Sequence, residues 1–176
     1  SQGSNRMNDF IIANLETILL KFQIMHVAGK EKFADYKNQF DFLTKNYSPI
    51  LMTNYHYAEY LGNQEMNVAM DAADLIVARG GSGSIFEIAA KGKPSIIVPF
   101  PESAADHQKE NAYDYAASGA AEVIEQENLL PSIFMSEAEK LVFQPEANAK
   151  MVAAANAFAR PDSAEKIAVD ILTLIS

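Results

Sequence analysis

The amino-acid sequence predicts an α/β fold, a Rossmann-like doubly wound parallel sheet with C-terminal helices. Short apolar segments alternate with segments of helical periodicity through most of the chain. Two of the apolar segments flank a glycine-rich turn and a short helix, and the pattern after residue 124 is helical to the end. No internal repeat or low-complexity linker interrupts this order. The sequence therefore indicates a parallel sheet covered by helices.

The clearest unit is the segment 74–99, DLIVARGGSGSIFEIAAKGKPSIIVP. Residues 75–78 predict a strand, the glycines and serines of 80–84 a loop, residues 85–89 a short helix, and residues 95–98 a second strand. A continuous apolar run suits a parallel strand that is covered on both faces, and the helix between the runs supplies the crossover that a parallel pair needs. We therefore expect one βαβ unit here.

The segments before this unit have weaker patterns. We expect an amphipathic helix with Met7, Ile11, Leu15 and Ile18, a strand at 22–28, a helix at 30–45, a short strand at 50–53, and a helix with Met66, Ala69, Met70 and Ala73 on one face. Residues 54–60 are aromatic and polar, which suits a loop better than a core element. A strand normally precedes the first helix of such a fold, so we expect the sequence to be a piece of a longer protein.

The segments after the unit continue the alternation and then become helical. We expect a loop at 99–105, a helix at 106–117, a strand at 120–124, and helices at 131–143, 147–159 and 163–175. The last of these has Ala164, Ile167, Ala168, Ile171 and Leu174 on one face. We interpret the apolar stripes of the terminal helices as core.

Composition excludes several classes of function. The 176 residues, 49% hydrophobic and 21% charged, are enough for one globular domain with a sizeable core. The absence of cysteine excludes disulfides, thiolate catalysis and cysteine-ligated zinc, and is compatible with a reducing cytoplasm. The net charge of -9, from 14 basic and 23 acidic residues, argues against nucleic acid and against an electrostatic membrane surface. No apolar run approaches the length of about 18 residues that suggests a spanning helix, and the polar start is not a signal peptide.

The glycine-rich turn is the candidate ligand site. Ligands of parallel sheets bind beyond the carboxyl ends of the strands, where this turn is expected. Its glycines let backbone N–H groups approach an anion, and the start of the next helix adds its positive dipole end. Glu87, one turn into that helix, can accept hydrogen bonds from a ribose diol. The turn lacks the lysine of a P-loop, and Phe86 stands where a dinucleotide fingerprint has glycine, so a tight turn without ligand stays open as an alternative.

Several motifs, in order, resemble one family. They are SQG before the first helix, HVAGK, ADLIVARGGSGSIFEIAAKGKPSIIVPFP, DHQKENA and SGAAEVIEQENL. Together they are similar to the C-terminal, donor-binding domain of MurG-type glycosyltransferases, which is the C-terminal half of a GT-B fold. Members of this family transfer N-acetylglucosamine from UDP-N-acetylglucosamine to the undecaprenyl-linked muramoyl-pentapeptide lipid of peptidoglycan synthesis. The resemblance covers nearly the whole chain.

The resemblance implies a set of UDP-sugar-binding residues. The pattern Arg79-x-Gly81-x-x-Ser84-x-x-Glu87 resembles the donor signature, whose glycine turn faces the diphosphate and sugar and whose glutamate binds the ribose. The helix that begins near Asp106 resembles the motif that holds the sugar hydroxyls, the first three residues resemble a loop that closes over the phosphates, and residues 61–63 resemble the segment that receives uracil. The candidate set is Ser1, Gln2, Gly3, Leu61, Asn63, Arg79, Gly81, Ser82, Gly83, Ser84, Glu87, His107, Gln108 and Asn111. Ser82 and Gly83 depart from the family pattern.

The resemblance also implies an activity and a domain organisation. It implies an inverting N-acetylglucosaminyltransferase without cofactor or metal, in which backbone N–H groups and a helix dipole stabilise the departing UDP. Residues 1–176 are then a single donor-binding domain, and the acceptor site and catalytic base belong to an N-terminal domain outside this sequence. The implied partners are UDP-N-acetylglucosamine and a lipid-linked acceptor, without nucleic acid. The implied location of the full-length protein is the cytoplasm, peripheral on the inner face of the plasma membrane.

Other interpretations stay open on the sequence. A UDP-sugar transferase with another lipid acceptor, a UDP-N-acetylglucosamine epimerase and a non-catalytic nucleotide-binding module would share most of these features. Among the histidines, we expect His26 to be structural, His56 to lie on the surface and His107 to be functional. Asp106 suits both a helix N-cap and a binding residue.

Overall fold

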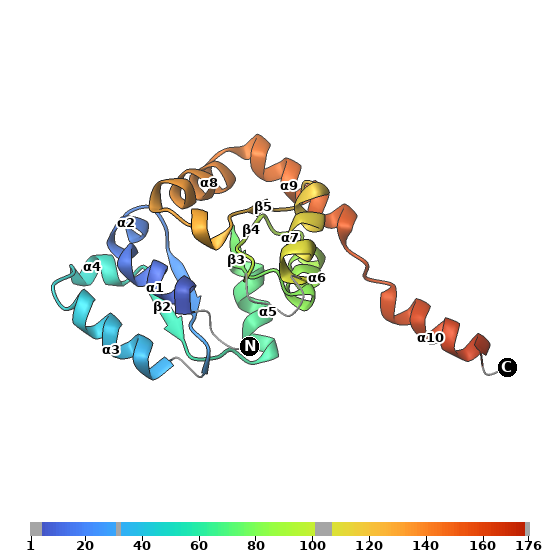
Figure 1. Cartoon of the computed structure of the whole chain (residues 1–176), viewed down its shortest axis with the longest axis horizontal. Helices are drawn as coiled ribbons and strands as arrows, with labels where there is room; N and C mark the ends of the chain where they lie inside the picture. The colour runs from blue at the N-terminus through green and yellow to red at the C-terminus, as the bar shows by residue number, and fades with distance from the viewer. Residues whose placement is uncertain (1–4, 31–32, 101–106, 175–176) are drawn as a thin grey trace. The chain divides into compact units, whose positions relative to one another are not determined.

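The computed structural model describes residues 5–30, 33–100 and 107–174 (Figure 1). The chain divides into two compact units, Ser1–Ala72 and Ala73–Ser176, which we call unit 1 and unit 2. Within the described residues each unit has its own parallel sheet, with two strands in unit 1 and three in unit 2. Strands alternate with helices in both, so the predicted α/β class is confirmed.

Unit 1 is built on the parallel pair of β1 and β2, with Ile24 opposite Tyr55 and Val27 opposite Ala58. The elements of unit 1 are α1 (Asn5–Ala13), α2 (Leu15–Leu19), β1 (Ile24–Val27), α3 (Phe33–Thr44), α4 (Pro49–Met52), β2 (Tyr55–Ala58) and α5 (Asn63–Ala72). Helix α1 packs on α3, and α2 packs on α4. The predicted first helix is broken after Ala13 into α1 and α2.

The segment 49–60 corrects two predictions. The expected strand at 50–53 is helix α4, and the expected loop at 54–60 contains strand β2. Pro49 stands in the first turn of α4, where its fixed φ favours a helix and its missing N–H costs nothing. In β2, Tyr55 and Tyr57 lie on one face and pack with the ring of Phe40 on α3, at centroid distances of 5.2 and 4.8 Å. Packing with a distant helix thus makes core from a segment that looks like a loop.

Unit 2 contains the predicted βαβ unit within a sheet of order β3-β4-β5. Its elements are β3 (Ile76–Ala78), α6 (Ser82–Ala90), β4 (Ser95–Ile97), α7 (His107–Ala117), β5 (Glu122–Val123), a 3-10 helix (Gln126–Asn128), α8 (Pro131–Phe143), α9 (Pro145–Phe158) and α10 (Ser163–Leu174). Both strand pairs are parallel, and the central strand β4 is buried along its length. Helix α6 packs against both α7 and α9.

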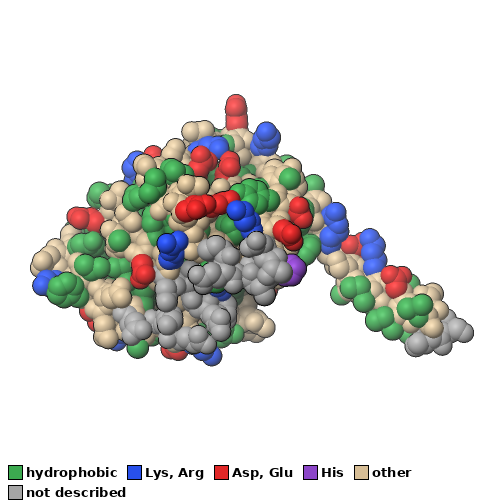
Figure 2. All heavy atoms as spheres, viewed as in Figure 1, with side chains coloured by type: hydrophobic (Ala, Val, Ile, Leu, Met, Phe, Trp, Pro, Cys, Tyr) green, Lys and Arg blue, Asp and Glu red, His purple; other side chains and the backbone are tan. Residues whose placement is uncertain are grey.

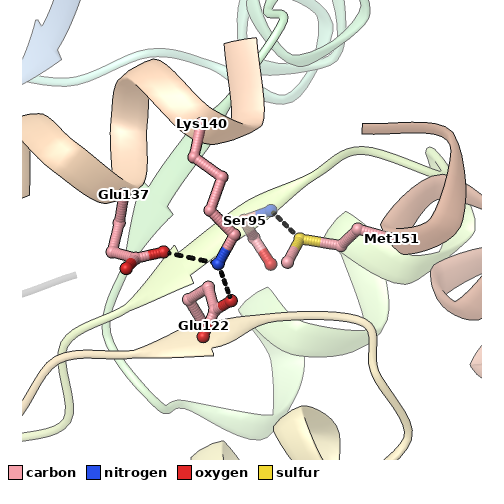
Figure 3. A network of polar contacts seen from close by, with 5 residues as sticks. All are labelled: Ser95, Glu122, Glu137, Lys140 and Met151. Carbon is pink, nitrogen blue, oxygen red and sulfur yellow. Dashed lines mark hydrogen bonds and ion pairs between the residues drawn. The ribbon is translucent and has the colours of Figure 1, made fainter. Parts of the chain in front are cut away.

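Polar contacts fix the amino ends of β4 and β5 to the terminal helices (Figure 3). The backbone N–H of Ser95 donates to the sulfur of Met151 on α9 at 3.3 Å. Lys140 on α8 donates to Glu122 of β5 and to Glu137 on its own helix, each at 2.8 Å. These hydrogen bonds raise the pKa of Lys140, with Glu122 as the larger cause. The amino ends of β4 and β5 are therefore covered by structural contacts, and ligands of such sheets bind at the opposite, carboxyl ends.

Helix α10 corrects the prediction that every terminal stripe is core. The stripes of α8 and α9 are buried at Leu141 and Met151. On α10, however, Ile167, Ile171 and Leu174 are 58%, 54% and 86% exposed, and apolar side chains lie on its surface in Figure 2. An apolar stripe shows that a helix can cover another surface, but not which surface it covers.

Candidate functional site

The glycine-rich turn is shorter than predicted because helix α6 already begins at Ser82. Gly81 is the N-cap, with φ -68 and ψ 132, and its carbonyl accepts a hydrogen bond of 3.1 Å from the N–H of Ile85. The N–H groups of Ser82, Gly83 and Ser84 thus precede the first donor of the helical ladder. These three residues are exposed, and the first turn carries no acidic residue. The start of α6 is therefore suited to an anion.

Gly80 lets helix α7 approach this turn closely. A Cβ atom at Gly80 would lie 2.0 Å from the backbone oxygen of Gln108, so a larger residue does not fit without a backbone shift. The side-chain amide of Asn111 donates to the carbonyl of Gly80 at 3.3 Å. The structure thus brings Gln108 and Asn111 to the glycine turn. Sequence reasoning missed Gly80, because nothing in a pair of adjacent glycines tells which one a distant helix contacts.

The other two glycines of the turn differ from Gly80. A Cβ built on Gly81 or Gly83 meets no heavy atom of the described residues within 4 Å. Neither glycine has a positive φ, since the positive values belong to Gly29, Gly92 and Gly119. The protein's own packing therefore does not require glycine at 81 or 83, and the open space lies beside the exposed N–H groups of α6.

The remaining predicted residues of unit 2 have different surroundings. Glu87 is exposed on α6, and Arg79 is half-buried directly after β3. Gln108 is half-buried, and its Oε1 atom is shielded from solvent. The ring of His107 is exposed, with Nδ1 3.8 Å from the carboxylate of Glu110. An exposed pair at this distance holds the ring only weakly.

Contacts further along α7 anchor the helix to the chain after β5. Lys109 Nζ lies 2.9 Å from Glu125 Oε1, and the hydroxyl of Tyr113 donates to the same oxygen at 2.5 Å. The hydrogen bonds from Tyr113 and then Lys109 lower the pKa of Glu125 to about 2. This anchor helps to hold α7, and with it Gln108, beside the glycine turn.

In unit 1, the predicted uracil segment forms the start of α5. The N–H of Gly62 donates to Glu65 Oε2 at 2.8 Å, and the carbonyl of Gly62 accepts from the N–H of Met66 at 2.8 Å. This is the glutamate half of a capping box, with Glu65 bonded to the N-cap backbone. Leu61 is half-buried, whereas Asn63 is exposed. The predicted residues Ser1, Gln2 and Gly3 lie outside the described residues, as does Asp106.

The histidines of unit 1 lie where the sequence suggested. His26 is buried and bonded to Asn8, Tyr36 and Tyr55, and burial lowers its pKa to about 4. His56 is exposed and lies 3.2 Å from the side-chain amide of Gln23, although it belongs to strand β2 and not to a loop. Within residues 5–30, 33–100 and 107–174, no group of three or more histidines and carboxylates is arranged to hold a metal ion. In the same residues no helix has the length and hydropathy to cross a membrane.

A family model decides the classification of this fold. The model of the glycosyltransferase family 28 C-terminal domain matches residues 1–167. The chain belongs to this family. The family match spans both units, including the turn before α6, the start of α7 and the start of α5.

Curated relatives are similar to this chain over part of their own length. A protein of Oenococcus oeni is 32% identical over 169 residues, which is 95% of this chain and 43% of the relative. One of Nostoc punctiforme is 42% identical over 103 residues, which is 58% of this chain and 29% of the relative. Both are named UDP-N-acetylglucosamine--N-acetylmuramyl-(pentapeptide) pyrophosphoryl-undecaprenol N-acetylglucosamine transferase. The chain spans less than half the length of these curated relatives.

Solved structures show the same fold. The chain is similar to MurG of Acinetobacter baumannii, with a TM-score of 0.76 and 24% identity over 98% of this chain and 47% of that one. It is also similar to a UDP-GlcNAc 2-epimerase of Neisseria meningitidis bound to UDP-GlcNAc, with a TM-score of 0.66 and 15% identity over 96% of this chain and 40% of that one. These likenesses confirm the GT-B-type α/β architecture. The fold is common to a transferase and an epimerase, so only the family separates the two.

Proposed function

We propose that the chain supplies the donor site of an N-acetylglucosaminyltransferase of peptidoglycan synthesis and binds UDP-N-acetylglucosamine. The observation that carries this proposal is the exposed N-terminus of α6, which has no acidic residue in its first turn. Beside it, Gly80 contacts the backbone of Gln108 and accepts from the side-chain amide of Asn111. The family match and the names of the curated relatives support the same substrate and reaction.

The proposed ligand contacts follow from the chemistry of each group. The N–H groups of Ser82, Gly83 and Ser84 would donate to the diphosphate, and the dipole of α6 would stabilise its charge. Glu87 would accept hydrogen bonds from the ribose hydroxyls, and Gln108 would pair with hydroxyls of the sugar. The segment of Leu61 and Asn63 would receive uracil. Arg79, His107 and Asn111 complete the proposed set within the described residues, and Ser1, Gln2 and Gly3 are proposed outside them.

The proposed reaction is a direct displacement. The acceptor hydroxyl oxygen would form a bond to the anomeric carbon, while the bond from that carbon to the β-phosphate oxygen breaks and its electron pair leaves with UDP. A base would take the hydroxyl proton. Backbone N–H groups at the start of α6 would stabilise the negative charge that develops on the leaving diphosphate. No residue of this chain is proposed as the base.

The proposal for the whole protein goes beyond this chain. We propose that an N-terminal domain binds the lipid-linked acceptor, supplies the base and attaches the protein to the inner face of the plasma membrane. The coverage of 43% of the Oenococcus oeni relative supports a second domain of similar size. We propose no binding of nucleic acid, since the net charge of -9 opposes it.

Calorimetric titration of the chain with UDP, UDP-N-acetylglucosamine and NAD tests the proposal. We expect weak binding of both uridine ligands, no binding of NAD and no transfer without the acceptor domain. Gly81→Val should weaken both uridine ligands at least about tenfold, because a side chain there would occupy the open space beside the α6 amides. Ala90→Val, at the far end of the same helix, is the matched control and should bind normally. Stronger binding of NAD than of UDP, or unchanged binding by Gly81→Val, would contradict the proposed site.

A further inference from the structure

Unit 1 contains a chain of buried polar side chains to which the proposed chemistry assigns no role. The hydroxyls of Tyr36 and Tyr55 lie 3.1 and 2.8 Å from Nδ1 of His26. Nε2 of His26 lies 3.0 Å from Oδ1 of Asn8, and Nδ2 of Asn8 donates to the carbonyl of Ala28 at 3.0 Å. His26 and Asn8 are 9% and 5% exposed. The chain of contacts thus runs from two tyrosines to one backbone carbonyl.

The contacts of Asn8 fix the proton position on one nitrogen of His26, whereas the hydroxyls of Tyr36 and Tyr55 contact both Nδ1 and each other. The carbonyl of Ala28 can only accept, so Asn8 donates through Nδ2 and accepts through Oδ1. Nε2 of His26 must then donate to the Oδ1 atom of Asn8. When the imidazole is neutral, its proton is on Nε2 and Nδ1 accepts from one tyrosine hydroxyl. Burial favours the neutral imidazole, since it lowers the pKa of His26 to about 4.

The carbonyl of Ala28, at the end of this series of hydrogen bonds, belongs to the turn that follows β1. The N–H of Ala28 donates to the carbonyl of Ala58 at 3.0 Å, and the N–H of Gly29 donates to that of Glu59 at 3.1 Å. Gly29 has a φ of 90, a conformation that favours glycine. Next to it, Lys30 places Nζ 4.4 Å from the ring centre of Tyr60. The segment that ends β1 is thus held by the end of β2 on one side and by Asn8 on the other.

A purely stabilising role would not need this chemistry. Burial of several polar groups costs desolvation, and apolar side chains of similar volume often stabilise a core as well or better. A network of buried hydrogen bonds adds a single, fixed position for the groups that it bonds. Here the bonded group is the carbonyl of Ala28, which lies at the carboxyl ends of parallel strands, where ligands of such sheets bind.

We infer that Asn8 and His26 are positioning residues for nucleotide binding, because they fix the turn of Ala28 and Gly29 and the adjoining segment 59–63. The inference rests on the proposed function, in which that segment receives uracil. Neither residue touches the nucleotide. His26 acts by orienting Asn8, and Asn8 acts by holding the carbonyl of Ala28.

Two substitutions of His26 in the full chain separate positioning from stability. His26→Gln places an amide group near the position of Nε2, so it can still donate to Asn8. His26→Asn reaches only the position of Nδ1 and cannot. We expect the UDP dissociation constant to rise about 5- to 20-fold in His26→Asn and in Asn8→Leu, and to stay within about threefold in His26→Gln. Ile18→Val, a buried change on α2 of the same unit, should lower the melting temperature without changing UDP affinity.

The readouts are UDP affinity by calorimetry, melting temperature, and the backbone amide resonances of Gly29 and Lys30 in the ligand-free chain. Rescue of affinity and of both resonances by His26→Gln, but not by His26→Asn, supports the inference. Equal affinity in the two His26 variants overturns it, whatever their melting temperatures. If one His26 variant does not fold, the UDP affinity of Asn8→Leu decides in its place, and an unchanged affinity overturns the inference. If the unaltered chain binds no UDP, the proposed function fails, and a positioning role toward nucleotide fails with it even where the resonances move.

Discussion

The two units secure the carboxyl ends of their strands by different means. In unit 2, backbone packs on backbone, because Gly80 admits α7 and the start of α6 stays exposed. In unit 1, buried side chains hold the end of β1. His26 contacts Asn8, and Asn8 donates to the carbonyl of Ala28 directly after the strand, beside the ring of Tyr36. The difference teaches where each unit is vulnerable. The stability of unit 2 should tolerate substitutions at the exposed start of α6 but not at Gly80. The stability of unit 1 should depend on pH and on its buried polar side chains.

The largest expected effect is that of Gly80→Val. The Cβ atom would lie 2.0 Å from a backbone oxygen, which cannot move aside as a flexible side chain can. We expect the free energy of unfolding of unit 2 to fall by more than about 3 kcal/mol. Urea titration followed by circular dichroism measures this loss. Gly81→Val is the matched variant, because the same side chain meets open space there and should leave the stability nearly unchanged. Equal losses in the two variants would show that the contact at Gly80 is not what limits the turn.

Unit 1 should show its vulnerability as a dependence of stability on pH. Burial lowers the pKa of His26 from 6.5 to about 4, so the folded state disfavours the charged imidazole. The stabilisation is complete above pH 6.5 and is lost as the pH falls toward 4, by about 3 kcal/mol in all. Urea titrations at pH 7 and pH 4.5, on the unaltered chain and on His26→Gln, isolate this contribution. The variant should lose less stability on acidification, and parallel losses in both proteins would remove His26 as the cause.

The next effect concerns binding and not stability. Glu87 is exposed on α6, so Glu87→Ala should leave the melting temperature unchanged. The carboxylate is proposed to accept from the ribose hydroxyls, and its loss should weaken UDP binding by about 1.5–3 kcal/mol. Calorimetry with UDP checks this. A variant that melts earlier but binds UDP normally would make Glu87 a structural residue.

The glycine turn shows how much a sequence can predict locally. The strands β3 and β4 and the helix between them follow from apolar runs, a glycine pair and Pro94, all within about 25 residues, and such signals need no distant partner. The start of α6 at Ser82 was missed by three residues, because glycine and serine also suit a loop. The role of Gly80 was beyond the sequence, since it depends on where α7 packs.

Two other regions show what local patterns cannot predict. Tyr55 and Tyr57 look like loop residues until Phe40, on another element, packs with them. The stripe of α10 has core periodicity, yet its side chains are exposed. In both regions the decisive information is whether another surface lies opposite, and a local pattern does not contain it. The buried hydrogen bonds from His26 through Asn8 to Ala28 also depend on residues that are distant in the sequence. The sequence did, however, indicate that His26 is structural.

The smallest expected effect is the most specific one, and it concerns Gln108. Oε1 of Gln108 is shielded from solvent, but its Nε2 group carries two N–H donors for sugar hydroxyls. The backbone of Gln108 lies against Gly80 of the glycine turn. Gln108→Ala should therefore weaken UDP-N-acetylglucosamine by about 1 kcal/mol and leave UDP unchanged. Because the close contact with Gly80 involves the backbone of Gln108, the substitution should preserve the fold.

Calorimetry with the two ligands, on this variant and on Glu87→Ala, gives a crossed comparison. Glu87→Ala should weaken both ligands, since both carry the ribose. Equal losses for UDP and UDP-N-acetylglucosamine in Gln108→Ala would remove this residue from the sugar site and leave the identity of the transferred sugar to the family match alone.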